Sequence, residues 1–187
     1  MNEYRLKKFD GSIYVCGFMA TGKSTIGKML AKELERPFVD LDKIISEKER
    51  SSIKAIFERF GEPYFREKEW QYLLEITRTF KGVVALGGGA LHNQQVIDHL
   101  KVHGLLIFLN TPLDVVVERV LRNTKRPIAL NSSGKIKSKE TLFRELKALY
   151  LSRKELYEQA HIKIESTGYE TKEAQTQLLI EKLKRYV

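Results

Sequence analysis

The stretch from Gly17 to Ser24 reads G-F-M-A-T-G-K-S and fits the spacing G-x-x-x-x-G-K-[ST], which is typical of a loop that binds nucleotide phosphates. Gly17 and Gly22 permit backbone angles that a side chain would resist, so successive N–H groups can point towards an anion. The Lys23 ammonium can reach the β- and γ-phosphates, and the Ser24 hydroxyl can bind Mg²⁺. The stretch predicts that a nucleoside triphosphate binds, and does not indicate what receives the phosphate.

Two carboxylates, Asp40 and Asp42, stand at the end of a second apolar run. We expect alternation along a strand to put both on the same side, where one can hold the Mg²⁺ shell and the other can orient or deprotonate a hydroxyl nucleophile. A structural interpretation is also open, because Asp42 directly precedes Lys43 and can cap the helix that follows.

A charged pair follows further along the chain. Arg66 and Glu69 are three residues apart in a helix that Pro63 can begin, so they can pair on one face. The pair is either an ordinary surface ion pair or an arginine held rigid to grip a carboxylate with two hydrogen bonds. The pattern alone leaves these two interpretations open.

Three consecutive glycines, Gly87, Gly88 and Gly89, end an apolar strand and would let the backbone approach a ligand closely. Arg126 and Arg153 are cations that suit a transferring phosphate or a substrate carboxylate, although each alone is also an ordinary surface residue. The four histidines have no metal-ligand spacing.

The elements that must position these residues alternate along the chain between apolar β-like runs and helical patterns. Strands are predicted over residues 12–16, 37–39, 83–86, 105–109 and 161–164. Helices are predicted over residues 23–35, 42–49, 52–60, 63–79, 93–100, 113–123, 140–159 and 172–186. This order predicts a three-layer αβα fold around a mainly parallel sheet, with ligands at the carboxyl ends of its strands.

Residues 123–139 have the weakest apolar pattern, and we interpret them as a mobile lid within a single domain of residues 1–187. The net charge is +9, and residues 122–154 hold ten basic and two acidic side chains. This basic segment lacks the interleaved aromatics of single-strand binders, so we expect it to serve the nucleotide and an anionic substrate rather than nucleic acid. An ordinary solvated face with spare lysines is the other open interpretation.

One cysteine, Cys16, excludes an internal disulfide and fits a reducing cytoplasm. The sequence has no apolar run of membrane-spanning length, and its first residues lack the apolar core of a secretion signal. We therefore expect a cytoplasmic protein with no membrane partner.

Together the motifs resemble the shikimate kinase family, over about residues 13–164. The residues that carry the resemblance are, in chain order, Gly17–Thr25, Phe38–Asp42, Phe57 through Gly61 and Glu62 to Phe65–Arg66 and Glu69, Leu86–Gly89, Arg126–Pro127, and Arg153 with Leu156–Tyr157. Each motif alone is less telling than all of them in this order and at these intervals.

The resemblance implies a monomer with a five-stranded parallel sheet that transfers the γ-phosphate of ATP to the 3-hydroxyl of shikimate, with Mg²⁺, in the biosynthesis of chorismate and the aromatic amino acids. It implies catalytic roles for Asp42, Lys23 and Arg126. It assigns substrate binding to Asp42, Arg66, Gly87, Gly88, Gly89 and Arg153. It assigns ATP binding to Ala20, Thr21, Gly22, Lys23, Ser24, Thr25, Arg122 and Arg126, and metal binding to Ser24 and, through water, Asp40.

The chain departs from the family pattern at Ala20, where the family usually has glycine. Ala20 suits the loop if its backbone angles are not left-handed. Ser46 stands where the family usually has an acidic residue after the Asp-x-Asp-x-x-Ile pattern. Ile128-Ala129 follow Pro127, where the family usually has a pair of leucines.

The alternative function is that of a gluconate kinase or another small-metabolite kinase of the same fold, because gluconate also carries a carboxylate. A nucleoside-monophosphate kinase is disfavoured because the sequence shows no base-recognition motif. A GTPase switch would need an N-K-x-D motif, which is absent. A nucleic-acid-dependent ATPase would typically have an apolar strand ending in Asp-Glu, whereas the apolar runs 83–86 and 105–109 are followed by Gly87 and Asn110.

Overall fold

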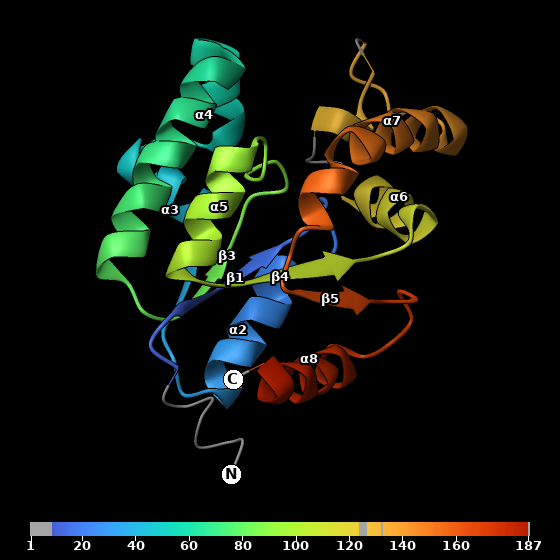
Figure 1. Cartoon of the computed structure of the whole chain (residues 1–187). Helices are drawn as coiled ribbons and strands as arrows, with labels where there is room; N and C mark the ends of the chain where they lie inside the picture. Colours follow the sequence, from blue (N-terminus) through green and yellow to red (C-terminus); the bar gives the residue numbers. More distant parts are fainter. Residues whose placement is uncertain (1–8, 124–126, 132, 187) are drawn as a thin grey trace.

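Five parallel strands form one sheet in the computed structural model, which describes residues 9–123, 127–131 and 133–186 (Figure 1). The strand order is β2-β3-β1-β4-β5. The strands are β1 (Ser12–Cys16), β2 (Phe38–Asp40), β3 (Val83–Ala85), β4 (Gly104–Asn110) and β5 (Ile162–Glu165). The predicted αβα fold is confirmed, with strand ends that differ from the prediction by one residue or so.

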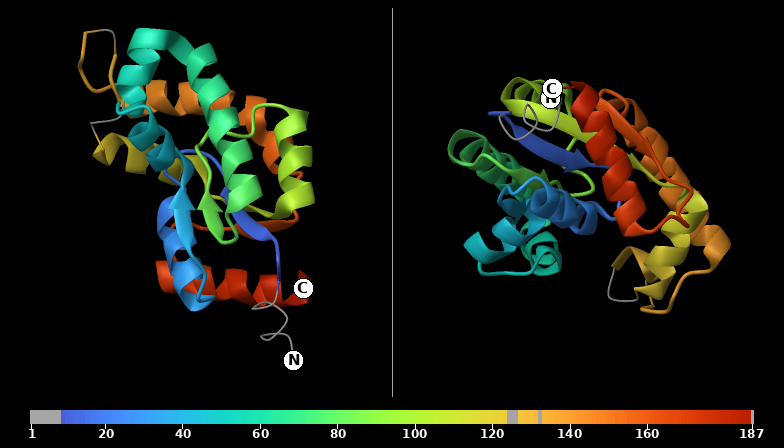
Figure 2. Two further views of the ribbon diagram at one scale, coloured as in Figure 1. Left: turned by 90° about the vertical axis from the view of Figure 1, so that its left-hand side faces the viewer. Right: turned by 90° about the horizontal axis from the view of Figure 1, so that it is seen from below.

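The helices cover both faces of the sheet. Side chains alternate between the two faces along each strand, and apolar side chains point to both, so each face must be buried. Ile13 and Val15 of β1 pack in a cluster with α2 (Lys23–Glu33) and α8 (Lys172–Tyr186) on one face. Tyr14 and Cys16 face the larger opposite cluster. Figure 2 shows α2 and α8 together on one side of the sheet, with the other helices beyond it.

The larger face is covered by helices, some of which also carry side chains of the candidate site. They are α3 (Leu41–Lys48), α4 (Ile53–Thr79), α5 (Gln94–His103), α6 (Leu113–Arg122) and α7 (Lys139–Tyr157). The two helices predicted over 52–60 and 63–79 form one element, α4, with a kink at Gly61, whose φ is 80°. Ser52 caps its first turn by accepting a hydrogen bond from the Ala55 N–H. None of the helices in the described ranges is long and apolar enough to cross a membrane.

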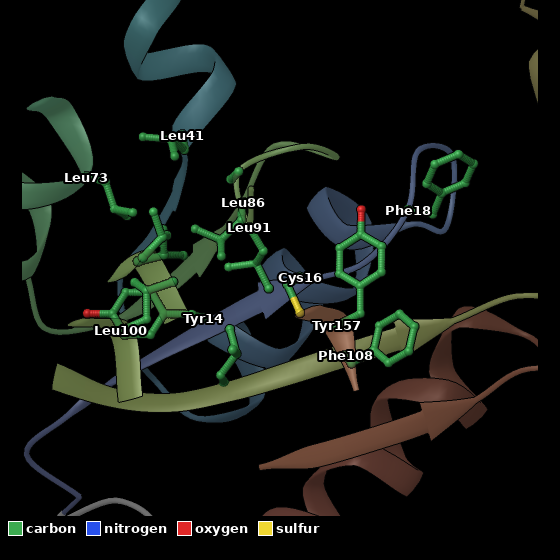
Figure 3. Close-up of a cluster of buried hydrophobic side chains, with 14 of the residues drawn as sticks. Tyr14, Cys16, Phe18, Leu41, Leu73, Leu86, Leu91, Leu100, Phe108 and Tyr157 are labelled. Carbon is green, nitrogen blue, oxygen red and sulfur yellow. The ribbon is translucent and has the colours of Figure 1, made fainter. Parts of the chain in front are cut away.

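A buried aromatic pair lies under the carboxyl ends of β1 and β4 (Figure 3). The rings of Phe108 and Tyr157 are stacked, with centroids 5.1 Å apart, beside the buried Cys16. Cys16 is buried in the core, as predicted, and this burial raises the pKa of its thiol to about 12.

The stretch expected to form the lid has some regular structure where the chain is described. It contains a 3₁₀ turn, Pro127–Ala129, and an antiparallel bridge between Leu130 and Ile136. The Asn131 side chain accepts hydrogen bonds from the N–H groups of Ser133 and Lys135 and so closes the turn between them. The weak apolar pattern of this stretch gave no indication of these two short elements.

Candidate functional site

The phosphate-binding loop joins β1 to α2 at the carboxyl edge of the sheet. Gly17 has a φ of 140°, and a Cβ there would lie 2.5 Å from the Leu109 carbonyl oxygen of β4. Gly22 has a φ of 100°. Both glycines are needed, as predicted, because a side chain would be strained or would collide. Ala20 is also left-handed, with a φ of 59°, so the condition under which alanine would suit this position is not met.

Two side chains of the loop hold one of its carbonyl groups. The Lys23 ammonium and the Thr21 hydroxyl donate hydrogen bonds of 2.8 and 2.9 Å to the Phe18 carbonyl oxygen. Thr21 is buried. Thr21 therefore shapes the loop from within, whereas Lys23 borders a cavity of about 290 Å³. The cavity is lined, among others, by Lys23, Ser24, Thr25, Asp40, Asp42 and Gly88.

Asp40 links the phosphate-binding loop to the next strand. Its Oδ2 accepts a hydrogen bond of 2.5 Å from the Ser24 hydroxyl, and its Oδ1 accepts from the N–H groups of Asp42 and Lys43. Asp40, not Asp42, is therefore the cap of α3. Asp40 and Asp42 line the same cavity, as predicted, but not through strand alternation, because β2 ends at Asp40 and the first turn of α3 carries Asp42 into the cavity.

The pairing of Ser24 with Asp40 suits a divalent cation. A hydroxyl and a carboxylate are hard oxygen donors, and Mg²⁺ is commonly held by one or two such groups together with phosphate oxygens and waters. The two oxygens that meet here belong to the residues that would hold the ion.

Each of the three glycines after β3 lies against a different part of the site. A Cβ at Gly87 would come 2.6 Å from Asp42 Oδ1, and one at Gly88 would come 3.3 Å from the Met19 nitrogen of the phosphate-binding loop. A Cβ at Gly89 would come 2.5 Å from Arg66 Nη2. The run therefore brings the backbone between β3 and α5 against all three groups at once.

Arg66 is held by carboxylates on both sides along α4. Its Nη1 lies 2.5 Å from Glu69 Oε2, and its Nη2 lies 3.0 Å from Glu62 Oε1. The Glu69 side chain is only 2% exposed, which favours the interpretation of Arg66 as a rigidly held arginine over that of a surface ion pair.

The second carboxylate oxygen of Glu69 is unusual. Oε1 is buried and accepts no hydrogen bond from the part of the chain that is described. Burial raises the pKa of Glu69 to about 7, against the opposing effect of Arg66, and the nearby charge of Asp42 adds to the rise. A carboxyl group that can take up a proton near neutral pH therefore lies beside Asp42 and Arg66.

The carbonyl oxygen of Gly88 is fixed from α7. Arg153 Nη1 and the Tyr157 hydroxyl donate hydrogen bonds of 3.1 and 2.6 Å to it. Arg153 is half-buried, and its positive charge acts to lower the pKa of Glu69, as that of Arg66 does. The structure thus brings both predicted carboxylate-binding arginines to the glycine run, one on each side.

The remaining predicted residues lie towards the nucleotide end. Thr25 is exposed in the first turn of α2, and Arg122 is exposed at the end of α6. Arg126 lies outside the described residues. The α6 arginine that contacts the phosphate-binding loop is Arg119, whose Nη1 donates a hydrogen bond of 3.1 Å to the Ala20 carbonyl. Nothing in the sequence singles out Arg119, because an arginine in an amphipathic helix looks like an ordinary surface residue.

The comparisons with known proteins agree with this geometry. The family model described as Shikimate kinase matches residues 19–184. A shikimate kinase of Sulfurihydrogenibium is 42% identical over 139 residues, which cover 74% of this chain and 82% of that protein. One of Persephonella marina is 37% identical over 157 residues, which cover 84% and 90%.

Solved structures give the same result. A shikimate kinase from Bacteroides thetaiotaomicron aligns with a TM-score of 0.84 at 31% identity, over 93% of this chain and 98% of that one. One from Acinetobacter baumannii in complex with shikimate aligns with a TM-score of 0.83 at 31% identity, over 97% and 99%. A gluconokinase from Sinorhizobium meliloti, at 19% identity and a TM-score of 0.55, shares the fold alone. On the match to the family model and on these relatives, the chain belongs to the shikimate kinase family.

Proposed function

We propose that this protein transfers the γ-phosphate of ATP to the 3-hydroxyl of shikimate and that the residues described above carry out the reaction. The observation that carries the proposal is the position of the glycine run. Gly88 lines the phosphate cavity together with Lys23 and Asp42, and its carbonyl is held by Arg153, while Gly89 lies against Arg66. A small anion held by the two arginines would therefore lie next to the phosphate cavity.

The reaction needs positioning and charge stabilisation more than covalent help from the protein. Lys23 and the loop N–H groups bind the phosphates and stabilise the charge that spreads over the transferred group. Asp42 orients the attacking hydroxyl and accepts its proton. Ser24 and, through water, Asp40 would hold Mg²⁺, which would neutralise phosphate charge when bound.

The substrate side works through its carboxylate. Arg66 and Arg153 are two guanidinium groups that can each form paired hydrogen bonds with it, and Arg66 is kept in place by Glu62 and Glu69. The backbone of Gly87, Gly88 and Gly89 forms the wall between the substrate and the phosphate-binding loop. As the lid closes, we expect Arg126 to approach the phosphates and to help exclude water.

ADP release with shikimate, gluconate and nucleoside monophosphates as acceptors tests the activity. We expect stimulation by shikimate alone. Stimulation by gluconate and not by shikimate would replace the proposal with the gluconate kinase alternative, and no stimulation by any of them would refute phosphoryl transfer to these acceptors.

Arg66→Ala tests the assignment of the substrate side. We expect the KM for shikimate to rise at least tenfold and the KM for ATP to change less than twofold. Arg78→Ala is a matched control, because Arg78 is an exposed arginine in the last turn of the same helix. An equal loss for both substrates would make Arg66 a structural residue.

The proposal extends to a cytoplasmic monomer that does not bind nucleic acid. It is supported by the buried single cysteine, which fits a reducing compartment, and by the basic segment, part of which serves the substrates. Size-exclusion chromatography with light scattering tests the monomer. Retention on DNA or RNA at physiological salt would contradict the last point.

A further inference from the structure

The phosphate-binding loop contains a non-glycine residue in a conformation that favours glycine. Ala20 has a φ of 59°, where a Cβ crowds the backbone, so the loop would relax if nothing held it. Ala20 and Gly22, with a φ of 100°, are the two left-handed residues just before α2.

Both residues are contacted from outside the loop by basic side chains of later helices. Arg119 of α6 donates from Nη1 to the Ala20 carbonyl oxygen, at 3.1 Å. The Lys172 ammonium of α8 lies 3.3 Å from the place where a Cβ on Gly22 would be. The carbonyl direction of Ala20 follows from its backbone angles, so a bond to that carbonyl selects those angles.

Arg119 is itself anchored to a rigid segment. Its Nη2 lies 3.3 Å from the Gly168 carbonyl oxygen, in the turn between β5 and α8. Glu170 closes that turn, because its carboxylate accepts hydrogen bonds from the N–H groups of Thr167 and Gly168. These hydrogen bonds, chiefly the one from Thr167, hold the pKa of Glu170 well below its usual range. A Cβ at Gly168 would lie 2.7 Å from Val115 of α6, so the turn packs closely on the helix that carries Arg119.

The guanidinium therefore spans two loops that are far apart in sequence. One end is fixed on the Gly168 turn and the other holds the backbone of Ala20. Because guanidinium hydrogen bonds have a fixed fork geometry, this contact restricts the Ala20 carbonyl more than a single donor on a flexible stem would.

We propose that Arg119 is a positioning residue that holds Ala20 in its left-handed conformation, so that the phosphate-binding loop is already shaped for ATP before the nucleotide arrives. The residue acts through the loop backbone. This inference rests on ATP binding by the loop, as in the proposed function above.

The consequence is a dependence between two positions 99 residues apart. Glycine adopts left-handed angles without the crowding that alanine meets. A loop with glycine at position 20 would therefore depend less on Arg119 to keep its shape. If Arg119 instead contacted the nucleotide directly, its substitution would weaken ATP binding equally with alanine or glycine at position 20.

A double-mutant cycle on Arg119→Gln and Ala20→Gly tests the proposal by ATP binding in calorimetry and by the KM for each substrate. We expect Arg119→Gln to weaken ATP binding about tenfold and to leave the KM for shikimate within twofold. We expect Ala20→Gly to change ATP binding less than threefold, and the double variant to recover at least threefold of the loss.

Additive effects would overturn the proposal, because they would mean that Arg119 does not act through Ala20. An unchanged affinity in Arg119→Gln would overturn it as well. Arg185→Gln, at an exposed arginine near the end of α8, is the control for loss of one positive charge.

Arg119→Lys keeps the test decisive if the glutamine variant does not fold. Lysine retains the charge and cannot span both carbonyl groups, so we expect a loss of ATP affinity that Ala20→Gly again relieves. Full activity in Arg119→Lys would show that charge alone suffices. Absence of wild-type turnover with shikimate would refute the proposed function, whereas an additive cycle in an active enzyme refutes only this inference.

Discussion

The Tyr157 hydroxyl donates a hydrogen bond of 2.6 Å to the carbonyl oxygen of Gly88, while its ring stacks on Phe108 in the core. One side chain thus ties the wall of the site to the packing beneath β4. Arg153, one turn earlier on α7, donates to the same oxygen, so a single helix sets the position of the glycine run and of one arginine proposed to bind the substrate.

Tyr157→Phe removes this hydrogen bond and keeps the stacked ring. We expect the protein to lose about 1 kcal/mol of unfolding free energy and the KM for shikimate to rise roughly fivefold, because Gly88 and Arg153 lose a common restraint. Urea unfolding and steady-state kinetics measure the two effects. Tyr150→Phe is the control, because Tyr150 is also on α7 and its hydroxyl donates to Asn110 Oδ1 instead of to Gly88. An equal rise in KM in Tyr150→Phe would contradict the explanation.

Gly89→Ala places a methyl carbon only 2.5 Å from the present position of Arg66 Nη2. We expect the guanidinium to be displaced and the KM for shikimate to rise by about tenfold or more, while the KM for ATP stays within twofold. Kinetics with each substrate varied in turn measure this split. A matching rise for ATP would mean that the whole glycine run had moved.

Asp40→Asn separates the charge of Asp40 from its role as a cap. Asparagine caps a helix about as well as aspartate, so we expect α3 and the melting temperature to be nearly unchanged. The Mg²⁺ concentration for half-maximal activity is expected to rise roughly five- to tenfold, because a carboxylate is lost from the metal shell. Asp98→Asn, on the exposed face of α5, is the control, and an unchanged Mg²⁺ requirement in Asp40→Asn would remove Asp40 from the metal site.

Glu69→Gln tests the raised pKa of about 7. A carboxyl group with a folded pKa above its unfolded value contributes stability below the unfolded pKa, and this is lost as the pH rises through about 7. The free energy of unfolding of the wild type, relative to the glutamine variant, is therefore expected to fall by roughly 1–3 kcal/mol between pH 5 and 8. Urea titrations over that range measure it, and parallel pH profiles would show that Glu69 stays charged throughout.

The sequence was sufficient for the sheet and for the carboxyl edge that holds the site. Apolar runs and the loop motif are local signals, and parallel strands necessarily bring their carboxyl ends to one edge. Gly17, Gly22 and the run from Gly87 to Gly89 were predicted because close approach of backbone leaves glycine as the residue that fits.

What the sequence could not predict depends on contacts between distant segments. The left-handed angle at Ala20 accompanies a hydrogen bond from Arg119, 99 residues away, and no local propensity favours it. The burial of Glu69 likewise depends on how α4 packs beneath Gly87. The choice of Asp40 over Asp42 as the helix cap turned on where β2 ends, and element ends are the least predictable feature of a sequence.

The burial of Cys16 makes this enzyme suited to site-specific labelling. With its only thiol enclosed beneath the site and its pKa near 12, the native chain presents no competing group to a maleimide or to a spin-label reagent. A cysteine introduced at exposed Lys135, paired with one at exposed Lys28 on α2, would carry two probes against an unreactive background. Measuring the distance between these probes as ATP and shikimate are added would test whether Lys135 moves relative to α2 during turnover.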